Sequence, residues 1–276
     1  MKFDLDTAWK DAMGLLARNA GLLAVIAGVF FFVPYAGIAI GIPEMRQLGE
    51  AQASGNLEAM MAAVEAVYGK YWYVFLAMAI LQGIGLLAMV ALLRRRANPT
   101  VGEALGAGAR SVVTYIAAQI LQTLLIVAVA FLLTAVFGLT GVIALAALGA
   151  VVAFVVACYL VTKLSLVAPV IAIEGERNPI AALRRSWGLT KGNSMRLFVF
   201  YALLIIAFLI VSLLISLVLG LVFALAGEQA ATLGEAVISG LINSVMIVIV
   251  ACVLAAAHTQ LARFETKPQA EADLEA

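Results

Sequence analysis

Residues 178–196 read NPIAALRRSWGLTKGNSMR, and the uncharged residues 197–227 follow them directly. Asn178 can cap a helix that begins at Pro179, because a proline ring suits the first helical position. Apolar residues then recur at three- and four-residue steps and share one face of that helix: Ile180, Leu183 and Trp187. A short basic helix that carries a Trp and leads into a membrane span is typical of the membrane interface. This stretch therefore predicts an integral membrane protein.

The composition and the spacing of the charges predict the number of spans. Hydrophobic residues make up 65% of the 276 residues and charged residues only 12%, which is unlike a soluble domain. Five long intervals contain no Asp, Glu, Lys or Arg: 19–43, 71–93, 111–162, 197–227 and 236–262. One crossing needs about 20 apolar residues, so the third interval holds two crossings. We predict an all-α polytopic membrane fold with six transmembrane helices, at about 21–42, 71–93, 111–137, 142–165, 197–226 and 236–261.

The segments that precede the odd-numbered spans resemble one another and predict three repeats. Shifting the N-terminal segment by 174 positions pairs Gly14 with Gly188, Leu15 with Leu189 and Asn19 with Asn193. The pair Asn98-Pro99 repeats the opening Asn178-Pro179. We expect short interfacial helices at about 5–18, 99–110 and 179–191, each followed by a pair of spans.

The rest of the chain completes a single membrane domain over residues 1–264. Apolar residues repeat at helical spacing after Asn56, so we expect an outer amphipathic helix at about 57–68. Residues 265–276 are polar and acidic, and we expect them to form a disordered tail.

The distribution of Lys and Arg predicts the orientation. Outside the spans, fifteen of these residues fall on one side, whereas only Arg46 and Lys70 fall on the other. Positive charge marks the cytoplasmic side, so we expect both termini to be cytoplasmic in a bacterial inner membrane. The three short helices fall on this same side.

Few residues in this sequence are suited to catalysis. The chain has one histidine, His258, and no pattern of a nucleophile with a base, of metal ligands or of a phosphate-binding loop. Cys158 and Cys252 fall inside spans and are interpreted as small buried hydrophobes. We therefore expect no catalytic residue, no metal and no cofactor. For His258, a hydrogen-bonded structural role is favoured over a proton relay.

Two groups of residues are candidate binding sites. The first would attract anionic lipid headgroups at the interface: Arg184, Arg185, Trp187 and Lys191. The alternative for its charges is a role in topology alone. The second group is an intramembrane polar face: Gln82, Gln119, Gln122, Asn243 and His258. Hydrogen bonding between helices explains this group without function, and a pathway for a solute is the alternative.

The run PVIAIEGERNPIAALRRSWGLTKGNSMRL, residues 169–197, resembles the signature of a bacterial family. That family comprises the integral membrane domain sometimes joined to glycerophosphodiester phosphodiesterases, together with YciC-like inner-membrane proteins. The matching positions include Pro169, Glu174, Ser186-Trp187 and Lys191-Gly192-Asn193. The resemblance implies a helical membrane domain. The phosphodiesterase domain is not expected here, because the segments between predicted spans, such as residues 43–70, are too short to hold one.

These observations lead to three functional hypotheses. The first is a non-enzymatic inner-membrane protein that organises or senses lipid through its cytoplasmic interfacial helices. The second is a transporter or channel for a lipid-like or small uncharged solute, and the third, least favoured, is a membrane-embedded lipid enzyme. A cavity lined by Gln82, Gln119 and Asn243 would favour the second. We expect membrane lipids as partners, and no nucleic acid.

Overall fold

The computed structural model describes residues 2–94, 100–225 and 227–275, and the described part is helical with no strand. Six helical segments are long and apolar enough to cross a membrane, as the charge-free intervals predict: Leu5–Gly41, Leu57–Leu92, Val101–Gly138, Ile143–Glu174, Ser194–Phe223 and Leu233–Phe264. The protein is therefore an all-α polytopic membrane protein.

The helices of these segments have the following bounds. The first half of the chain contains α1 (Leu5–Ala27), the π-helical turn η1 (Gly28–Phe32), α2 (Val33–Gly41), α3 (Glu44–Ser54) and α4 (Leu57–Leu92). The second half contains α5 (Val101–Gly138), α6 (Ile143–Leu164), α7 (Val167–Pro169), the π-helical turn η2 (Val170–Glu174), α8 (Pro179–Leu189), α9 (Ser194–Leu225) and α10 (Glu228–Glu275).

Two of the three expected short helices are not separate elements. The segment 5–18 is the first part of α1, which runs without a break through Asn19, whose side chain donates to the carbonyl of Leu15 at 2.8 Å. The segment 99–110 belongs to α5, which begins after a capping box between Thr100 and Glu103 and continues to Gly138. Neither sequence contains a turn that would end the helix. Asn98 and Pro99 lie outside the described residues.

Other expected boundaries also shift because helices continue across them. The outer helix 57–68 is the start of α4, which Asn56 caps and which has non-helical backbone angles only at Tyr71. Residues 44–54 form α3, a helix that was not predicted as a separate element. At the other end, α10 remains helical to Glu275, through the residues expected to be disordered.

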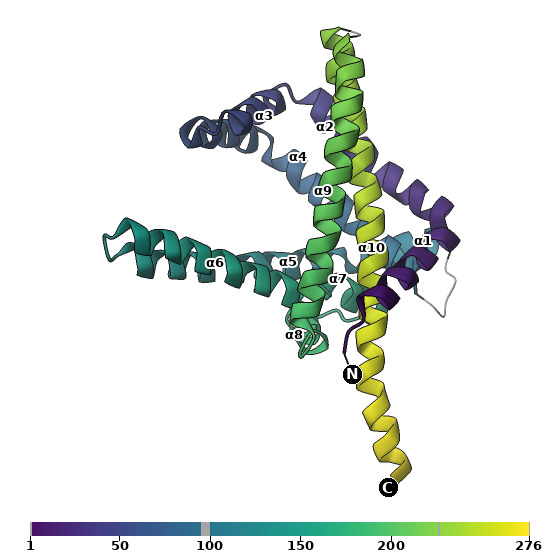
Figure 1. Ribbon diagram of the computed structural model, residues 1–276. Helices are drawn as coiled ribbons and strands as arrows, with labels where there is room; N and C mark the ends of the chain where they lie inside the picture. The colour runs from purple at the N-terminus through teal and green to yellow at the C-terminus, as the bar shows by residue number, and fades with distance from the viewer. Residues whose placement is uncertain (1, 95–99, 226, 276) are drawn as a thin grey trace.

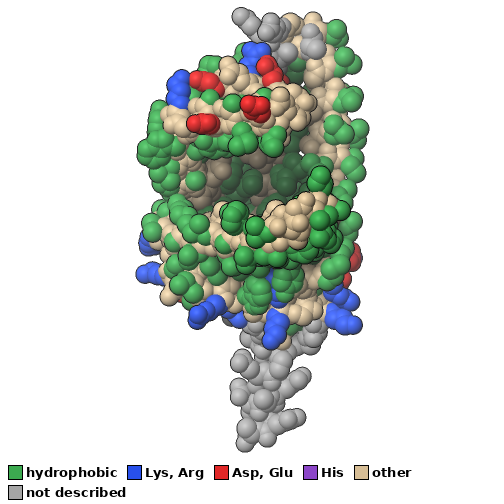
Figure 2. Space-filling model, turned by 90° about the vertical axis from the view of Figure 1, so that its left-hand side faces the viewer, with side chains coloured by type: hydrophobic (Ala, Val, Ile, Leu, Met, Phe, Trp, Pro, Cys, Tyr) green, Lys and Arg blue, Asp and Glu red, His purple; other side chains and the backbone are tan. Residues whose placement is uncertain are grey.

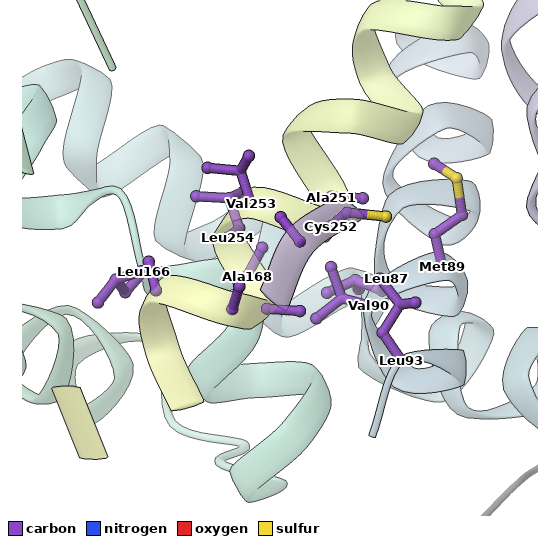
Figure 3. Close-up of a cluster of buried hydrophobic side chains, with 14 of the residues drawn as sticks. Leu87, Met89, Val90, Leu93, Leu166, Ala168, Ala251, Cys252, Val253 and Leu254 are labelled. Atoms are coloured by element: carbon purple, nitrogen blue, oxygen red, sulfur yellow. The ribbon is translucent and has the colours of Figure 1, made fainter. Parts of the chain in front are cut away.

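The core lies where α1, α4, α7 and α10 cross. Figure 3 shows part of this junction, with Leu87 and Val90 of α4 facing Ala251 and Cys252 of α10. The helix α5 also approaches α4 closely, because Gly108 of α5 has no side chain. A Cβ atom at Gly108 would lie 2.6 Å from the carbonyl oxygen of Ile84, so this contact requires glycine.

The helical hairpins spread outward from this junction. In Figure 1, α9 and α10 run side by side, while the hairpin of α5 and α6 extends sideways from them. The helix α3 and the start of α4 extend to the same side nearer the α9–α10 turn, and α8 lies near the N-terminus. Figure 2 shows the molecule hollowed between these two projections, with hydrophobic side chains around the hollow. Lys and Arg side chains gather at the lower end, whereas acidic and basic side chains mix at the upper end.

Candidate functional site

The helix α8 forms because its own sequence satisfies both of its ends. The side chain of Asn178 accepts hydrogen bonds from the backbone N–H groups of Ile180 at 2.9 Å and Ala181 at 3.3 Å, as a capping residue does. Gly192 adopts a left-handed backbone (φ +80°) in the turn between α8 and α9, which stops the two helices from merging. The predicted short helix at 179–191 is therefore present as a separate element.

One face of α8 is fixed to the end of α6. Ala182, Ser186 and Leu189 are buried on this face. The hydroxyl of Ser186 donates to the carbonyl oxygen of Lys163 at 3.0 Å and accepts from the N–H of Leu166 at 3.1 Å. These two hydrogen bonds satisfy backbone groups at the break between α6 and α7, and they attach α8 to that break.

A groove of about 650 Å³ lies on a second face of α8, and the basic pair Arg184 and Arg185 lines it. The other lining residues are Glu174, Glu176, Asn178, Ile180, Ala181 and Gly188. The guanidinium Nε of Arg185 lies 2.9 Å from a carboxylate oxygen of Glu174. Glu176 accepts from the N–H of Asn178 at 2.8 Å. Of these two carboxylates, Glu174 is therefore the one that orients Arg185.

His258 of α10 joins this group from the side opposite the groove. Its Nε2 lies 2.8 Å from the second carboxylate oxygen of Glu174, and only 4% of the residue is exposed. The Nδ1 atom of the same ring is buried without a partner among the described residues. Glu174 therefore links α8 to α10 through Arg185 and His258. The interpretation of His258 as a hydrogen-bonded structural residue agrees with this geometry.

The other two candidate headgroup residues, Trp187 and Lys191, are absent from this groove. Trp187 meets Tyr159 of α6 edge to face, with ring centroids 6.0 Å apart. The ammonium group of Lys163 lies 5.1 Å from the centre of the Trp187 ring and 5.7 Å from that of Tyr159. The structure thus divides the four predicted residues into a groove with two arginines and an aromatic face with lysines. Lys163 was counted in the sequence only as a topology signal.

The N-terminus is attached to the turn that follows α8. The side chain of Asn193 accepts from the N–H of Phe3 at 2.7 Å, and Arg196 donates to the carbonyl oxygen of Phe3 at 3.0 Å. The ring of Phe3 also packs against Phe200 of α9. Asn193 lies in the stretch 178–196. No local sequence pattern predicts its hydrogen bond to Phe3, which is 190 positions away.

Besides His258, the residues of the predicted intramembrane polar face come from three helices. Gln82 lies on α4, Gln119 and Gln122 on α5, and Asn243 on α10. No hydrogen bond joins these four side chains to one another among the described residues, and a carboxamide oxygen of Gln122 is buried without a partner there. The grooves at α8, at α3 and between α9 and α10 are lined by other residues.

Two further grooves lie away from α8. Trp9 and the facing sides of α9 and α10 line an apolar groove of about 440 Å³. A groove of about 850 Å³ lies between α2, α3, α4 and α10. Beside it, Lys70 donates to Glu44 at 2.7 Å, and this hydrogen bond holds the pKa of the Glu44 carboxyl below its usual range. Among the described residues, no three His, Cys, Asp or Glu side chains come together as metal ligands.

Comparison with known proteins identifies the family of this chain. No curated protein and no solved structure matches it. One protein family, described as "Domain of unknown function (DUF7847)", matches residues 4–263. This match covers α1 through the apolar part of α10, and with it all the groups of the α8 region. The chain belongs to the DUF7847 family.

Proposed function

We propose that this protein is a non-enzymatic inner-membrane protein that organises or senses lipid through α8. The observation that carries this proposal is the position of α8. It is a short helix whose two arginines line a groove, and it is fixed to the end of a membrane-spanning helix. Basic side chains gather at that end of the molecule, which we propose to be cytoplasmic, with both termini on the same side.

The geometry of α8 suits the headgroup region of a bilayer. Trp187 and Ile180 are 39% and 52% exposed, whereas Ala182, Ser186 and Leu189 on the packed face of the helix are buried. An indole ring in such a position is stable at the level of the headgroups. Arg184 is exposed and lines the groove, where a guanidinium can donate to a phosphate oxygen. The ion pair with Glu174 fixes Arg185 beside it.

His258 supports a structural role over a catalytic one. Its ring is buried, and its Nε2 is held by a carboxylate that also binds Arg185. A general base needs access to a substrate proton. Glu174 lines the groove, whereas His258 does not line it and binds one carboxylate oxygen of Glu174.

The proposal is tested by removing the charges of α8. The variant R184Q/R185Q/K191Q should retain less phosphatidylglycerol and cardiolipin through purification than the parent protein. Each basic residue near an anionic surface contributes about 1 kcal/mol, so the loss should reach ~3 kcal/mol if the terms add. Added salt should weaken lipid retention in the parent protein.

A matched variant controls for general loss of charge. K10Q/R18Q/R110Q removes three basic residues from the same proposed side without touching α8. Its lipid retention should change much less. Because Lys and Arg also direct insertion, cysteine labelling at Thr100 and Ser54 must show the parent orientation in both variants. Equal lipid retention in the correctly inserted α8 variant and in the parent would overturn the proposal.

A further inference from the structure

The groove beside α8 and the aromatic face, formed by Trp187, Tyr159 and Lys163, differ in their balance of charge. In the groove, Arg184 and Arg185 share the space with Glu174 and Glu176, so positive and negative side chains are equal in number. On the aromatic face, Lys163 makes no hydrogen bond or ion pair through its ammonium group with any described residue. Lys191 directly follows Thr190, whose hydroxyl donates to the carbonyl oxygen of Lys163 at 3.3 Å, so a second positive residue lies close in the chain to this contact. An anion is therefore better balanced on the aromatic face than in the groove.

Lys163 is held in place more firmly than an ordinary surface lysine. Only 3% of the residue is exposed. Its backbone carbonyl accepts from the hydroxyl of Ser186 at 3.0 Å and from that of Thr190 at 3.3 Å. The side chain lies beside the rings of Trp187 and Tyr159. The fold thus positions a cation at the junction of α6 and α8.

The two aromatic rings compensate only part of the cost of burying this charge. A cation over an aromatic ring gains a modest electrostatic stabilisation, whereas an ammonium group without an anion loses much of its hydration. A second positive residue, Lys191, adds repulsion. A phosphate group between the two lysines would remove both costs and would accept charge-assisted hydrogen bonds.

We infer that Lys163, Lys191 and Trp187 form a binding site for the phosphate of an anionic phospholipid, with Tyr159 packing beside its glycerol and acyl groups. This inference rests on the proposed function, and it names the face of α8 and the charge class of the lipid. Trp187 and Tyr159 are 39% and 46% exposed, so a lipid can reach the site from the bilayer. A free phosphate ion has the same chemistry, and the experiment distinguishes these two sources.

The first test is native mass spectrometry of Lys163→Met with phosphatidylglycerol and with phosphatidylcholine. Methionine keeps the length and apolar character of the side chain. We expect phosphatidylglycerol binding to fall at least about fivefold, as for the loss of one basic residue near an anionic surface. Phosphatidylcholine binding should not change, and Lys163→Arg should retain most of the parent affinity. Unchanged phosphatidylglycerol binding in Lys163→Met would overturn the inference.

A second measurement does not depend on the folding of the Lys163 variant. In W9F/W72F, Trp187 is the single tryptophan, and its fluorescence reports directly on the aromatic face. Titration with phosphatidylglycerol in detergent should change its emission, whereas phosphatidylcholine should not. Saturation by millimolar inorganic phosphate alone would assign the site to free phosphate and overturn the lipid assignment. An emission unaffected by both phosphatidylglycerol and inorganic phosphate would overturn the site.

The double variant R184Q/R185Q separates this inference from the proposed function. If the aromatic face holds the anion, this variant should lose less phosphatidylglycerol than Lys163→Met does. If R184Q/R185Q loses the lipid and Lys163→Met keeps it, the inference is wrong and the proposed function stands. If neither variant changes and the triple α8 variant also keeps its lipid, both are wrong.

Discussion

The helices α9 and α10 form one hairpin, and both are apolar enough to cross a membrane, but they differ sharply in burial. In its most apolar stretch, α9 buries none of its residues, whereas α10 buries 44%. Figure 1 shows the reason: α10 passes through the junction of α1, α4 and α7, while α9 lies along its outer side. Hydrophobicity alone therefore does not tell which helix lies in the core.

The types of apolar residue separate the two helices better. The buried part of α10 is rich in small side chains: Ala251, Cys252, Ala255, Ala256 and Ala257. The exposed part of α9 consists mainly of large ones, such as Leu209, Leu213 and Leu217. Lipid chains solvate a leucine as well as a protein core does, so close packing between helices depends on small residues. The comparison predicts that equal substitutions have unequal effects in the two regions.

The largest expected difference is between two leucine truncations. Leu87 of α4 is fully buried in the junction, whereas Leu209 of α9 is 58% exposed. Leu87→Ala should cost about 2–5 kcal/mol of unfolding free energy, because it leaves a cavity in the core. Leu209→Ala should cost much less, since lipid or detergent fills the space. Reversible unfolding in mixed micelles measures both. Equal losses would show that α9 is also packed against protein.

A smaller difference is expected between two glycines. A Cβ atom at Gly108 would lie 2.6 Å from the backbone oxygen of Ile84, which cannot move aside without separating α4 from α5. Gly108→Ala should therefore destabilise the protein by about 1–3 kcal/mol through overpacking. Gly220 of α9 has no atom within 4 Å of such a position, so Gly220→Ala should be neutral or stabilise by up to about 1 kcal/mol. The same unfolding assay applies, and a neutral Gly108→Ala would contradict the close contact.

Much of the fold could be predicted from sequence because charges are excluded from lipid. The charge-free intervals predicted six spans, and Asn178 and Pro179 predicted the start of α8 by local rules. The separation of the segment 5–18 from the first span failed for a local reason as well. Its Asn19 bonds back to Leu15 and continues the helix, whereas the corresponding Asn193 lies in a turn and binds Phe3. The two corresponding asparagines, Asn19 and Asn193, thus have different structural roles.

The candidate site could be predicted only in part, since its main contacts are distant in sequence. Glu174 and His258 are 84 residues apart, and no periodicity connects them. Lys163 looked like one of fifteen topology signals, and its burial became apparent only with α8 placed against α6. Conversely, Gln82 and Asn243 both carry a carboxamide, but no hydrogen bond joins them in the part of the chain that the structure describes. Local patterns identified the helix of the site, and packing determined which residues meet on it.

The smallest expected effect concerns α3, at the edge of the molecule far from the junction. Its contact with α4 includes the ion pair of Glu44 with Lys70, in which the lysine side chain is 62% exposed. The hydroxyl of Tyr71, where α4 departs from helical geometry, donates to the same carboxylate at 3.1 Å. The hydrogen bond from Lys70 lowers the pKa of Glu44 in the folded protein. This contact should therefore respond to acid, and the junction should not.

The sign follows from the lowered pKa of Glu44. A carboxyl that is more acidic when folded stabilises the attachment of α3 above its ordinary pKa of 4.5, and this stabilisation is lost as the pH falls through the lower folded value. After correction for the intrinsic pH dependence of exchange, amide protons of α3 should lose protection between pH 6 and pH 3. Those around Leu87 should keep theirs. In Glu44→Gln, which has no charge to lose, the protection of α3 should be slightly lower than in the parent at pH 6 and should not fall further at pH 3. The effect should be small, because an exposed ion pair of this kind contributes little. If α3 in this variant shows the parent's full pH dependence, another group must control the contact, because position 44 no longer titrates.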